Sequence, residues 1–378
     1  MFQKMTHFSC LPTRAVLDAL GSPDKKLKII HIAGTNGKGS TAEFFTRILI
    51  AAGKRVGTFC SPQVYSFYDQ FKINGKEIPP EVFERYLSRA GGVSDGASEF
   101  EIQTAAVLAA FAGEGCDYAV IECGMGGLDD ATNAVYKKEL AVITSISKEH
   151  TAYLGDTLKD ICTHKAGIIK NCPAIINAHQ CDEVKEFFKG FKFADKIGKI
   201  YDGGFVYNGK EFALSVIGCL QPYNAACAIE GARLLGIDED AIYRGIKESK
   251  PRGRIERFTV CGKTYILDGA HNPAAFEPLS GYLKGGKKRT IIFGCLSDKD
   301  IDGNLSRLKA DEIIAVNCPS PRTRSADEVA AHCRKFFKKV KQAESVTDAL
   351  EIADAEEVVV CGSFTLLGEA LEWIEKRQ

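Results

Sequence analysis

The sequence predicts an α/β protein of two domains, each built around a parallel sheet. The chain has 378 residues, which is more than one ordinary hydrophobic core needs. Short β-branched runs alternate with helix-length amphipathic segments along most of it. A compact break, Pro-Arg-Gly at 251–253, interrupts this alternation, which then resumes. We therefore expect an N-terminal domain over residues 1–249 and a smaller C-terminal domain over residues 250–378.

In the first domain, five short apolar runs predict buried strands: LKIIHIAG, VGTFC, DYAVIEC, LAVITSI and PAIINA. Helices are expected at 38–52 and at 100–111, because apolar residues in both segments recur at helical spacing. Near 200–216 the pattern changes to short strands broken by glycines, and two helical segments follow up to about residue 249.

The second domain repeats the alternation of strand and helix. Its strands are expected at TYILDG, RTIIFG, EIIAVN and EVVVCG, each followed by a helical stretch. This pattern predicts a smaller, doubly wound, Rossmann-like domain. Because no period of twenty to fifty residues recurs, repeat architectures are excluded.

Composition favours a cytoplasmic enzyme that acts on small molecules. Lys plus Arg and Asp plus Glu both number 49, so no excess positive charge exists to hold nucleic acid or an anionic membrane. The first residues lack the apolar stretch of a signal peptide, and the longest apolar run, 105–112, is too short to span a bilayer. The fourteen cysteines include no Cys-x-x-Cys pair, so we interpret them as reduced core residues.

The segment IIHIAGTNGKGST, residues 29–41, carries the strongest functional signal. An apolar strand runs into a glycine-rich turn and then a helix, which is the arrangement that binds phosphate at backbone N–H groups. A strict Walker A motif would have Gly at 32 and Ser or Thr at 39, where Ile32 and Gly39 stand. The hydroxyl role would therefore shift to the next residues. The candidate nucleotide-binding residues are Gly34, Thr35, Asn36, Gly37, Lys38, Gly39, Ser40 and Thr41.

The same segment resembles the signature of folylpolyglutamate synthases, a branch of the Mur ligase superfamily that includes dihydrofolate synthases. Further segments match the family in order: TFCSPQV, IECGMGG with DATN, SKEHTAYLGDT, HKAGIIK, LQPYNAA, GRIERF, DGAHNP, FGCLSDKD and CGSF. These matches extend from about residue 11 to residue 364, which is nearly the whole chain.

The resemblance implies an N-terminal P-loop-type domain, a Rossmann-like C-terminal domain and an active site between them. It implies an ATP-dependent amide ligase that adds L-glutamate to a folate, to dihydropteroate or to both, through an acyl phosphate, with one or two Mg²⁺ ions. We expect a monomer without nucleic-acid or membrane partners. Two alternatives remain open: another Mur-superfamily ligase with a non-folate acceptor, and an ATP-binding switch that ligates nothing.

Three residues are candidate metal ligands by resemblance: Ser61, Glu122 and His150. Glu122 also qualifies from the sequence, since it ends an apolar strand and precedes a glycine-rich turn, where α/β proteins bind ligands. Mg²⁺ prefers oxygen donors, so a carboxylate, a hydroxyl and phosphate oxygens suit it. The alternatives that remain open are an ordinary turn residue for Ser61 and a hydrogen-bonded structural histidine for His150.

Lys165 in HKAGIIK would be a surface charge by its residue type alone. By resemblance it is carbamylated by CO₂, which replaces an ammonium group with an anion. The resemblance also implies that Asn224 contacts the adenine, that Arg254 and Asp268 contact the nucleotide, and that His271 orients the reacting group. The expected catalytic residues are Lys38, His150, Lys165 and His271.

Three positions depart from the family pattern. His164 stands where an acidic residue is usual, Gln70 replaces a basic residue, and Leu128 replaces an arginine. The last two changes remove partners for carboxylates or phosphates. They make the identity of the acceptor less certain than the use of ATP, unless they are neutral changes in loops.

Overall fold

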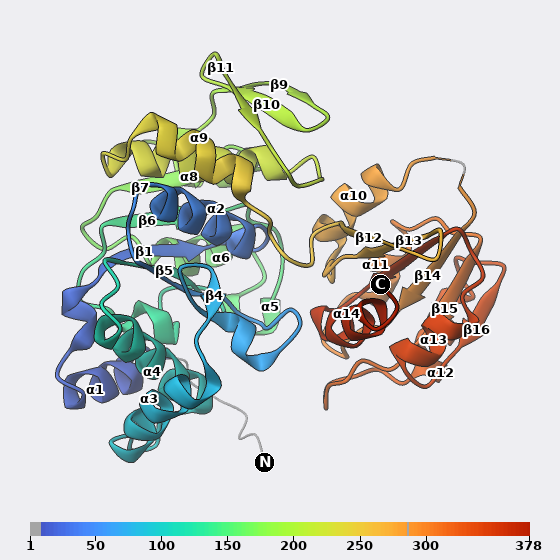
Figure 1. Ribbon diagram of the computed structural model, residues 1–378, viewed down its shortest axis with the longest axis horizontal. Helices are drawn as coiled ribbons and strands as arrows, with labels where there is room; N and C mark the ends of the chain where they lie inside the picture. The colour runs from blue at the N-terminus through green and yellow to red at the C-terminus, as the bar shows by residue number, and fades with distance from the viewer. Residues whose placement is uncertain (1–8, 286) are drawn as a thin grey trace. The chain divides into compact units, whose positions relative to one another are not determined.

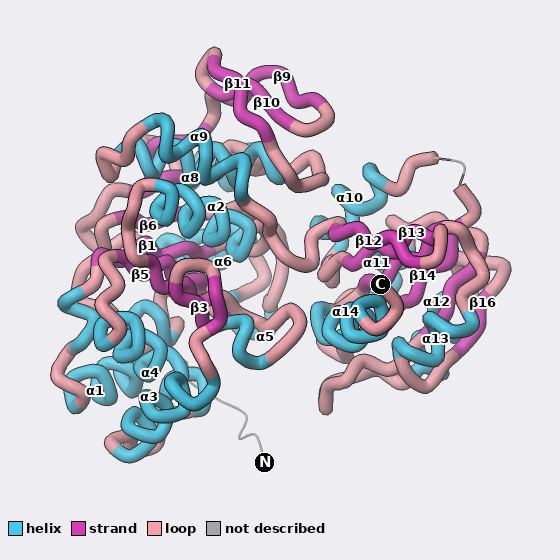
Figure 2. Tube along the Cα trace, viewed as in Figure 1, coloured by secondary structure: helices cyan, strands magenta, loops and turns pink. Residues whose placement is uncertain are grey.

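The computed structural model describes residues 9–285 and 287–378 and divides into two compact units. The first unit contains the chain up to Pro62, Tyr68–Ser215 and Leu220–Lys250. The second contains Pro251–Gln378 together with two short segments, Gln63–Phe67 and Val216–Cys219. Figure 1 labels the elements of both units, and Figure 2 distinguishes their helices, strands and loops.

The first unit is built on an eight-stranded sheet with the order β4-β3-β2-β5-β1-β6-β7-β8. All neighbours are parallel except the β2/β3 and β3/β4 pairs. The strands are β1 (Lys28–Ala33), β2 (Val56–Phe59), β3 (Phe71–Ile73), β4 (Lys76–Glu77), β5 (Tyr118–Glu122), β6 (Leu140–Ile143), β7 (Ala174–Asn177) and β8 (Lys192–Ala194). The five strands expected from apolar runs are confirmed as β1, β2, β5, β6 and β7, and they form the buried middle of the sheet.

Helices cover both faces of this sheet (Figure 1). Helices α2, α8 and α9 pack together on one face, and α1, α3 and α4 on the other. The helices are α1 (Leu11–Ala19), α2 (Lys38–Ala51), α3 (Pro80–Gly92), α4 (Glu99–Gly113), α5 (Thr151–Leu154), α6 (Leu158–Ala166), α7 (Asp182–Phe187), α8 (Gln221–Leu234) and α9 (Glu239–Glu248). Helix α4 begins at a capping box in which Ser98 and Glu101 satisfy each other's backbone N–H groups, so the start of the helix expected at 100–111 is fixed locally.

The short strands expected at 200–216 form a separate antiparallel sheet of three strands. They are β9 (Ile197–Tyr201), β10 (Gly204–Tyr207) and β11 (Lys210–Ala213). The two helices expected after them are α8 and α9, so the change of pattern in the sequence marks a real change in structure.

The second unit has a six-stranded sheet with the order β12-β13-β17-β14-β15-β16, in which only β12 is antiparallel to its neighbour. Its strands are β12 (Glu256–Val260), β13 (Lys263–Leu267), β14 (Arg289–Phe293), β15 (Glu312–Ala315), β16 (Val340–Gln342) and β17 (Glu357–Cys361). Its helices are α10 (Pro273–Tyr282), α11 (Ile301–Leu305), α12 (Ala326–Cys333), α13 (Val346–Ile352) and α14 (Leu367–Glu375). Two apolar clusters, one with α13 and α14 and one with α10, α11 and α12, cover opposite faces of the sheet. This is the doubly wound arrangement that the sequence predicts.

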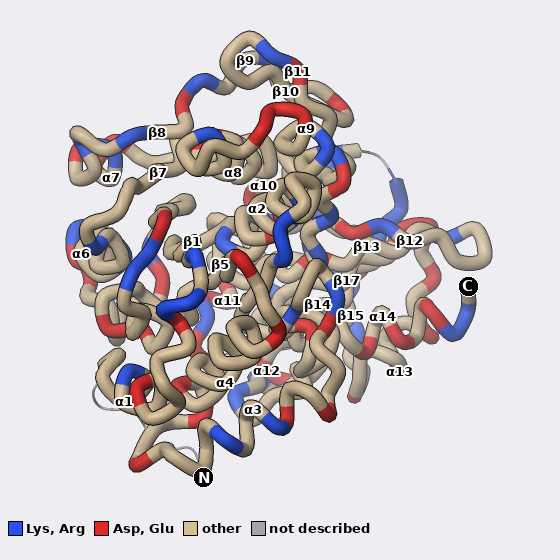
Figure 3. Tube along the Cα trace, turned by 60° about the vertical axis from the view of Figure 1, so that its left-hand side comes forward, with Lys and Arg blue, Asp and Glu red and all other residues tan. Residues whose placement is uncertain are grey.

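Charged residues of both signs are interspersed along both units (Figure 3), in keeping with the equal numbers of acidic and basic residues. No helix in the described part of the chain is long and apolar enough to cross a membrane.

Candidate nucleotide and ligase site

The glycine-rich turn follows β1 in the middle of the first sheet, where β5 and β6 flank it. The turn occupies residues 34–37, and α2 begins at Lys38. Gly34 has a φ of 153°, and a Cβ atom there would lie 1.8 Å from the Thr144 hydroxyl oxygen. Gly37 has a φ of 92°. Side chains are therefore excluded at both positions, as a loop that wraps phosphate requires.

Hydrogen bonds to the segment after β6 hold this turn in shape. Thr35 N donates to Ser145 O at 2.8 Å, and the Thr35 hydroxyl donates to Ser147 O at 3.0 Å. The Ser145 hydroxyl in turn donates to Asn36 O at 3.1 Å. The loop is thus fixed by the protein itself, which lowers the ordering cost of binding a ligand.

The start of α2 presents polar groups suited to phosphate. Lys38 Nζ donates to Thr35 O at 3.2 Å and lies 3.6 Å from Glu122 Oε1. The hydroxyl groups of Ser40 and Thr41 are buried and have no hydrogen-bond partner among the described residues. A buried polar group without a partner costs about 1–3 kcal/mol. The two hydroxyls therefore fit a site that a phosphate or a hydrated metal ion completes.

The candidate metal ligands Ser61 and Glu122 lie at the same edge of the sheet. Glu122 is the buried last residue of β5, and Ser61 follows β2, which is the parallel neighbour of β5. A Cβ atom on Gly39 would lie 3.3 Å from Glu122 Oε2, so the carboxylate abuts the start of α2. No group of three or more His, Cys, Asp and Glu residues within the described ranges could hold a metal ion. A metal here would depend on hydroxyl and phosphate oxygens, which is the donor set that Mg²⁺ prefers.

His150, the third candidate ligand, precedes α5, beyond the end of β6. It has a φ of 53°, and its Nε2 lies 4.0 Å from Glu149 Oε1. The segment that leads to it is the one that anchors the glycine-rich turn, so the chain connects His150 closely to the phosphate loop.

Lys165 does not behave as a surface charge, so the interpretation from its residue type alone is wrong. Its side chain on α6 is only 3% exposed, and Nζ donates to Gly34 O at 2.7 Å. Burial, together with the nearby Lys38 charge, lowers the pKa of this amine from 10.5 to about 7. A large fraction of the side chain is therefore neutral at physiological pH, directly beneath the glycine-rich turn.

Of the three residues that depart from the family pattern, Leu128 and His164 lie next to each other, and Gln70 lies elsewhere. Leu128 is 42% exposed, and its backbone N–H donates to His164 O at 2.7 Å. The ring Nδ1 of His164 lies 3.9 Å from Asp129 Oδ2, so an acidic residue of the turn faces the histidine. Gln70, in contrast, is buried.

Asn224 lies against the phosphate loop from α8. A Cβ atom on Gly37 would lie 2.4 Å from Asn224 Oδ1, and Asn177 Nδ2 donates to the same oxygen at 3.4 Å. The amide of Asn224 also donates to Gln221 at 3.3 Å. The residue expected to contact the adenine is thus held beside the phosphate-binding turn.

In the second unit, Arg254 and His271 gather around Phe364. The Arg254 guanidinium lies 4.5 Å from the Phe364 ring centroid, and the His271 ring lies 5.8 Å from it. Asp268 stabilises the surrounding turns, because one of its carboxylate oxygens accepts from Ile255 N and the other from Ala270 N, both at 2.8 Å. Burial raises the pKa of the Asp268 carboxyl, while the Arg254 charge opposes the shift. Phe364, the first residue of a short 3-10 helix, was missed as a site residue, because an apolar aromatic residue resembles any other core residue in the sequence.

A buried lysine that sequence reasoning also missed lies beneath the glycine-rich turn after β5. Lys138 is only 3% exposed, and its Nζ donates to Asn133 Oδ1 at 2.5 Å and to Ile168 O at 2.7 Å. Asn133 Nδ2 donates to Leu128 O at 2.8 Å and to Gly167 O at 3.2 Å. These bonds connect the turn that follows Glu122 to the end of the helix that carries Lys165.

Comparisons with known proteins agree with this geometry. The chain matches the models of the Mur ligase middle domain over residues 32–230 and of the Mur ligase glutamate ligase domain over residues 253–364. It is 32% identical over 375 residues to a dihydrofolate synthase/folylpolyglutamate synthase of Escherichia coli, covering 93% of this chain and 87% of that protein.

Solved structures of such enzymes have the same fold. E. coli FolC in complex with DHPP and ADP superposes with a TM-score of 0.86 at 30% identity, covering 100% of this chain and 95% of that one. A bifunctional folylpolyglutamate synthase/dihydrofolate synthase with Mn, AMPPNP and L-glutamate bound superposes with a TM-score of 0.83 at 28% identity, covering 98% of this chain and 95% of that one. The chain therefore belongs to the Mur ligase superfamily and, within it, to the family of folylpolyglutamate and dihydrofolate synthases.

Proposed function

We propose that this chain is an ATP-dependent ligase that joins the amino group of L-glutamate to a carboxylate of a folate, of dihydropteroate or of both. The observation that carries the proposal is the preformed phosphate loop with Lys38 at its end and two buried hydroxyls, Ser40 and Thr41, that lack a protein partner. The similar structures with ADP and DHPP, or with AMPPNP and L-glutamate, support this choice of substrates.

In the proposed reaction, ATP binds along residues 34–41, and its γ-phosphoryl group passes to the substrate carboxylate. The products of this step are ADP and an acyl phosphate. The amino nitrogen of glutamate then forms a bond to the carbonyl carbon, loses a proton, and expels phosphate as the C–O bond breaks. Lys38 and the N–H groups at the start of α2 stabilise the negative charge on the transferring group, which is the main demand of phosphoryl transfer.

A divalent ion, Mg²⁺ in our proposal, would be held by Ser61, Glu122 and His150 together with phosphate oxygens. When bound, it would neutralise charge on the β- and γ-phosphates. The oxygen donors of Ser61 and Glu122 suit Mg²⁺ better than the imidazole does. His150 is therefore the weakest member of the proposed set.

Lys165 is proposed to act as a carbamate. The carbon of CO₂ would bond to the neutral Nζ, and loss of a proton would leave an anion near Lys38 and the phosphate loop. The pKa of about 7 supports this step, since only the neutral amine reacts. We expect ¹³CO₂ to give a carbamate resonance that Lys165→Met removes and that Lys138→Met retains. Acetate or formate should restore part of the activity of Lys165→Ala. Rescue by small amines instead would show that the ammonium charge was needed, and the carbamate would be rejected.

We further propose a division of roles between the N-terminal domain, residues 1–249, and the C-terminal domain, residues 250–378. The first would bind ATP, with Asn224 near the adenine. In the second, Arg254 and Asp268 would contact the nucleotide and His271 would orient the reacting group. The hydrogen bonds of Asp268 to two backbone N–H groups give it a structural role as well, so the fold of Asp268→Asn must be checked before its activity is interpreted.

The decisive experiment offers ATP, Mg²⁺ and L-glutamate with dihydropteroate, tetrahydrofolate or no acceptor, and identifies products by mass spectrometry. A glutamyl adduct of either acceptor together with ADP supports the proposal, and its identity decides which acceptor is used. ADP release that needs neither acceptor nor glutamate would favour the ATP-binding switch. Glutamate-dependent ADP release with neither acceptor consumed would favour a ligase for a different carboxylate.

A further inference from the structure

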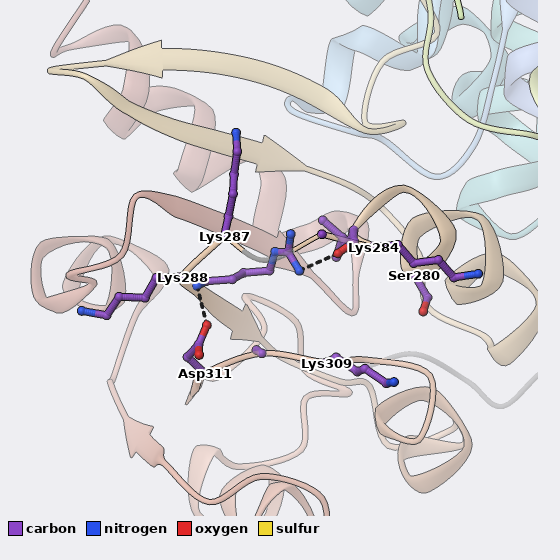
Figure 4. Close-up of a pocket in the computed structure, with 10 residues that line it drawn as sticks. Ser280, Lys284, Lys287, Lys288, Lys309 and Asp311 are labelled. Atoms are coloured by element: carbon purple, nitrogen blue, oxygen red, sulfur yellow. Dashed lines mark hydrogen bonds between the residues drawn. The ribbon is translucent and has the colours of Figure 1, made fainter. Parts of the chain in front are cut away.

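A hollow of about 610 Å³ lies at the amino edge of the second sheet (Figure 4). The last turn of α10, the residues that follow it and the segment just before β15 line it, and Arg289, the first residue of β14, forms part of its wall. Asp268 and His271, by contrast, follow the carboxyl end of β13, which is parallel to β17 and through it to β14. The hollow thus lies at the edge opposite the proposed ligase residues, and its volume is within the range of small-molecule sites.

Four lysines line this hollow, and none of their ammonium groups is paired. Lys284, Lys287, Lys288 and Lys309 make no hydrogen bond or ion pair within the part of the chain that the structure describes. They are all exposed. The hollow therefore carries a concentrated positive charge in a chain whose net charge is zero.

The other charged groups of the wall are already engaged. Arg289 Nε and Nη2 lie 2.6 and 2.5 Å from Glu357 Oε1, and Nη1 donates to Leu283 O at 2.8 Å. The carboxylate of Asp311 accepts from Arg289 N at 2.8 Å. Asp311 is the one acidic residue that lines the hollow, so it offsets only part of the lysine charge.

Lysines that have a structural role at the same edge are paired. Lys339 and Lys341, before and on β16, lie 2.7 and 3.0 Å from Glu312 Oε1. The lysines of the hollow repel one another without such a partner, and a bound anion would remove that repulsion. Figure 4 shows Lys284, Lys309 and Ser280 extending toward one side, while Lys287 and Lys288 extend to others. Lys284, Lys309 and Ser280 are the residues that could contact one ligand, whereas Lys287 and Lys288 only add to the positive electrostatic potential around it.

We propose that Ser280, Lys284 and Lys309 bind a small flexible polyanion, with at least two phosphate or carboxylate groups, at a site separate from ligation. Ammonium groups on flexible stems act as point charges and impose no planar geometry. A chain of spaced anionic groups therefore fits better than a single carboxylate. The hydroxyl of Ser280 would donate one directed hydrogen bond.

The test is isothermal titration of the full-length chain at fixed ionic strength with two probes, tripolyphosphate and tri-γ-glutamate. Tripolyphosphate also fits the phosphate loop, so the wild-type chain should bind two equivalents and Lys284→Gln/Lys309→Gln only one. Where the second site is still measurable, its affinity should fall by roughly two- to thirtyfold, as expected for losing two exposed ion pairs. Lys263→Gln/Lys376→Gln, which removes a half-buried and an exposed lysine of the same unit that are paired with Asp354 and Glu372, is the control with equal charge change.

The site would be supported if the wild-type chain and the control chain bound a second equivalent of either probe and the Lys284→Gln/Lys309→Gln chain did not. The probe that binds would identify the ligand as a phosphate or a polycarboxylate. The proposal would be overturned if neither probe gave such a site, or if the control pair weakened binding equally. The ligation rate of Lys284→Gln/Lys309→Gln at saturating substrates should equal that of the wild type. A large loss of ligation would mean that these lysines serve the reaction itself, and the separate site would be rejected.

Discussion

Replacing Lys165 by methionine should stabilise the folded chain while it removes ligase activity. The lysine is 3% exposed, and its pKa is about 7 in the folded chain against 10.5 for the free side chain. One pKa unit corresponds to about 1.4 kcal/mol, so protonation opposes folding by roughly 5 kcal/mol at most below pH 7. Methionine cannot make the hydrogen bond that Lys165 donates to Gly34 O, and the loss of this bond costs about 1–3 kcal/mol. The net gain in the free energy of unfolding below pH 7 should be at most roughly 2–4 kcal/mol.

The pH dependence of this gain follows from the direction of the shift. Below about pH 7 the lysine is charged in both states, and the folded chain bears the full penalty. Between pH 7 and 10.5 the unfolded chain binds more protons than the folded chain, so the stability of the wild type rises with pH. The advantage of Lys165→Met should therefore be largest below pH 7 and fall as the pH rises, and near pH 10.5, where the charge penalty has vanished, only the loss of about 1–3 kcal/mol from the missing hydrogen bond should remain.

Urea unfolding of both chains at pH 6.5, 8 and 9.5, in CO₂-free buffer, measures the effect. Lys159→Met on the same helix is the control, because Lys159 is exposed and its replacement should change the urea midpoint little at any pH. An advantage of Lys165→Met that stayed constant with pH, or a clear destabilisation at pH 6.5, would refute the assignment of Lys165 as a buried amine.

Three further predictions concern neighbouring residues. Lys38→Ala should leave the circular dichroism spectrum unchanged and lower kcat by about 10² or more, and near-normal turnover would reject the phosphate loop. Glu122→Gln should raise the Mg²⁺ concentration that gives half-maximal rate, whereas an unchanged titration would remove Glu122 from the metal site. Lys138→Met should lower the ligation rate, because Asn133 and Ile168 O lose their donor, and near pH 10.5, where burial no longer penalises the ammonium, it should lower the free energy of unfolding by about 1–3 kcal/mol. Lys137→Met, at the exposed neighbouring residue, is the control, and an equal effect of this substitution would contradict the prediction for Lys138.

Much of the fold could be predicted because its signal is local. The central strands β1, β5 and β6 are continuous apolar runs, as strands covered on both faces must be. The edge strands β4 and β16, and β3 next to β4, are only two or three residues long and partly exposed, so they leave no apolar pattern. Strand β12 was also missed, since its residues alternate between half-buried and exposed, with a single fully buried position.

The strand, glycine-rich turn and helix at residues 28–51 were predictable for the same reason. The glycines, the lysine and the flanking strand and helix are adjacent in sequence, and the restrictions at Gly34 and Gly37 are backbone properties of those residues. The anchors of the loop were not predictable, because Ser145 and Ser147 come from a segment more than one hundred residues away and carry no distinctive pattern. The same holds for Phe364 beside Arg254 in the second unit.

The two buried lysines show what a sequence cannot distinguish and a structure can. Lys138 and Lys165 are equally buried, and burial lowers the pKa of both amines, to about 8 and about 7. Lys138 donates to two acceptors that connect two segments, which is the arrangement expected of a structural lysine. Lys165 donates to the backbone oxygen of Gly34 alone among the described residues, and the Lys38 charge lies nearby. Lys138 also has a neighbouring cation, Lys170, so the difference between the two amines lies in their hydrogen bonds: within the described part of the chain, Lys138 has two acceptors and Lys165 has one. This difference in hydrogen bonding, more than the burial, is why we propose Lys165 and not Lys138 as the site of the carbamate.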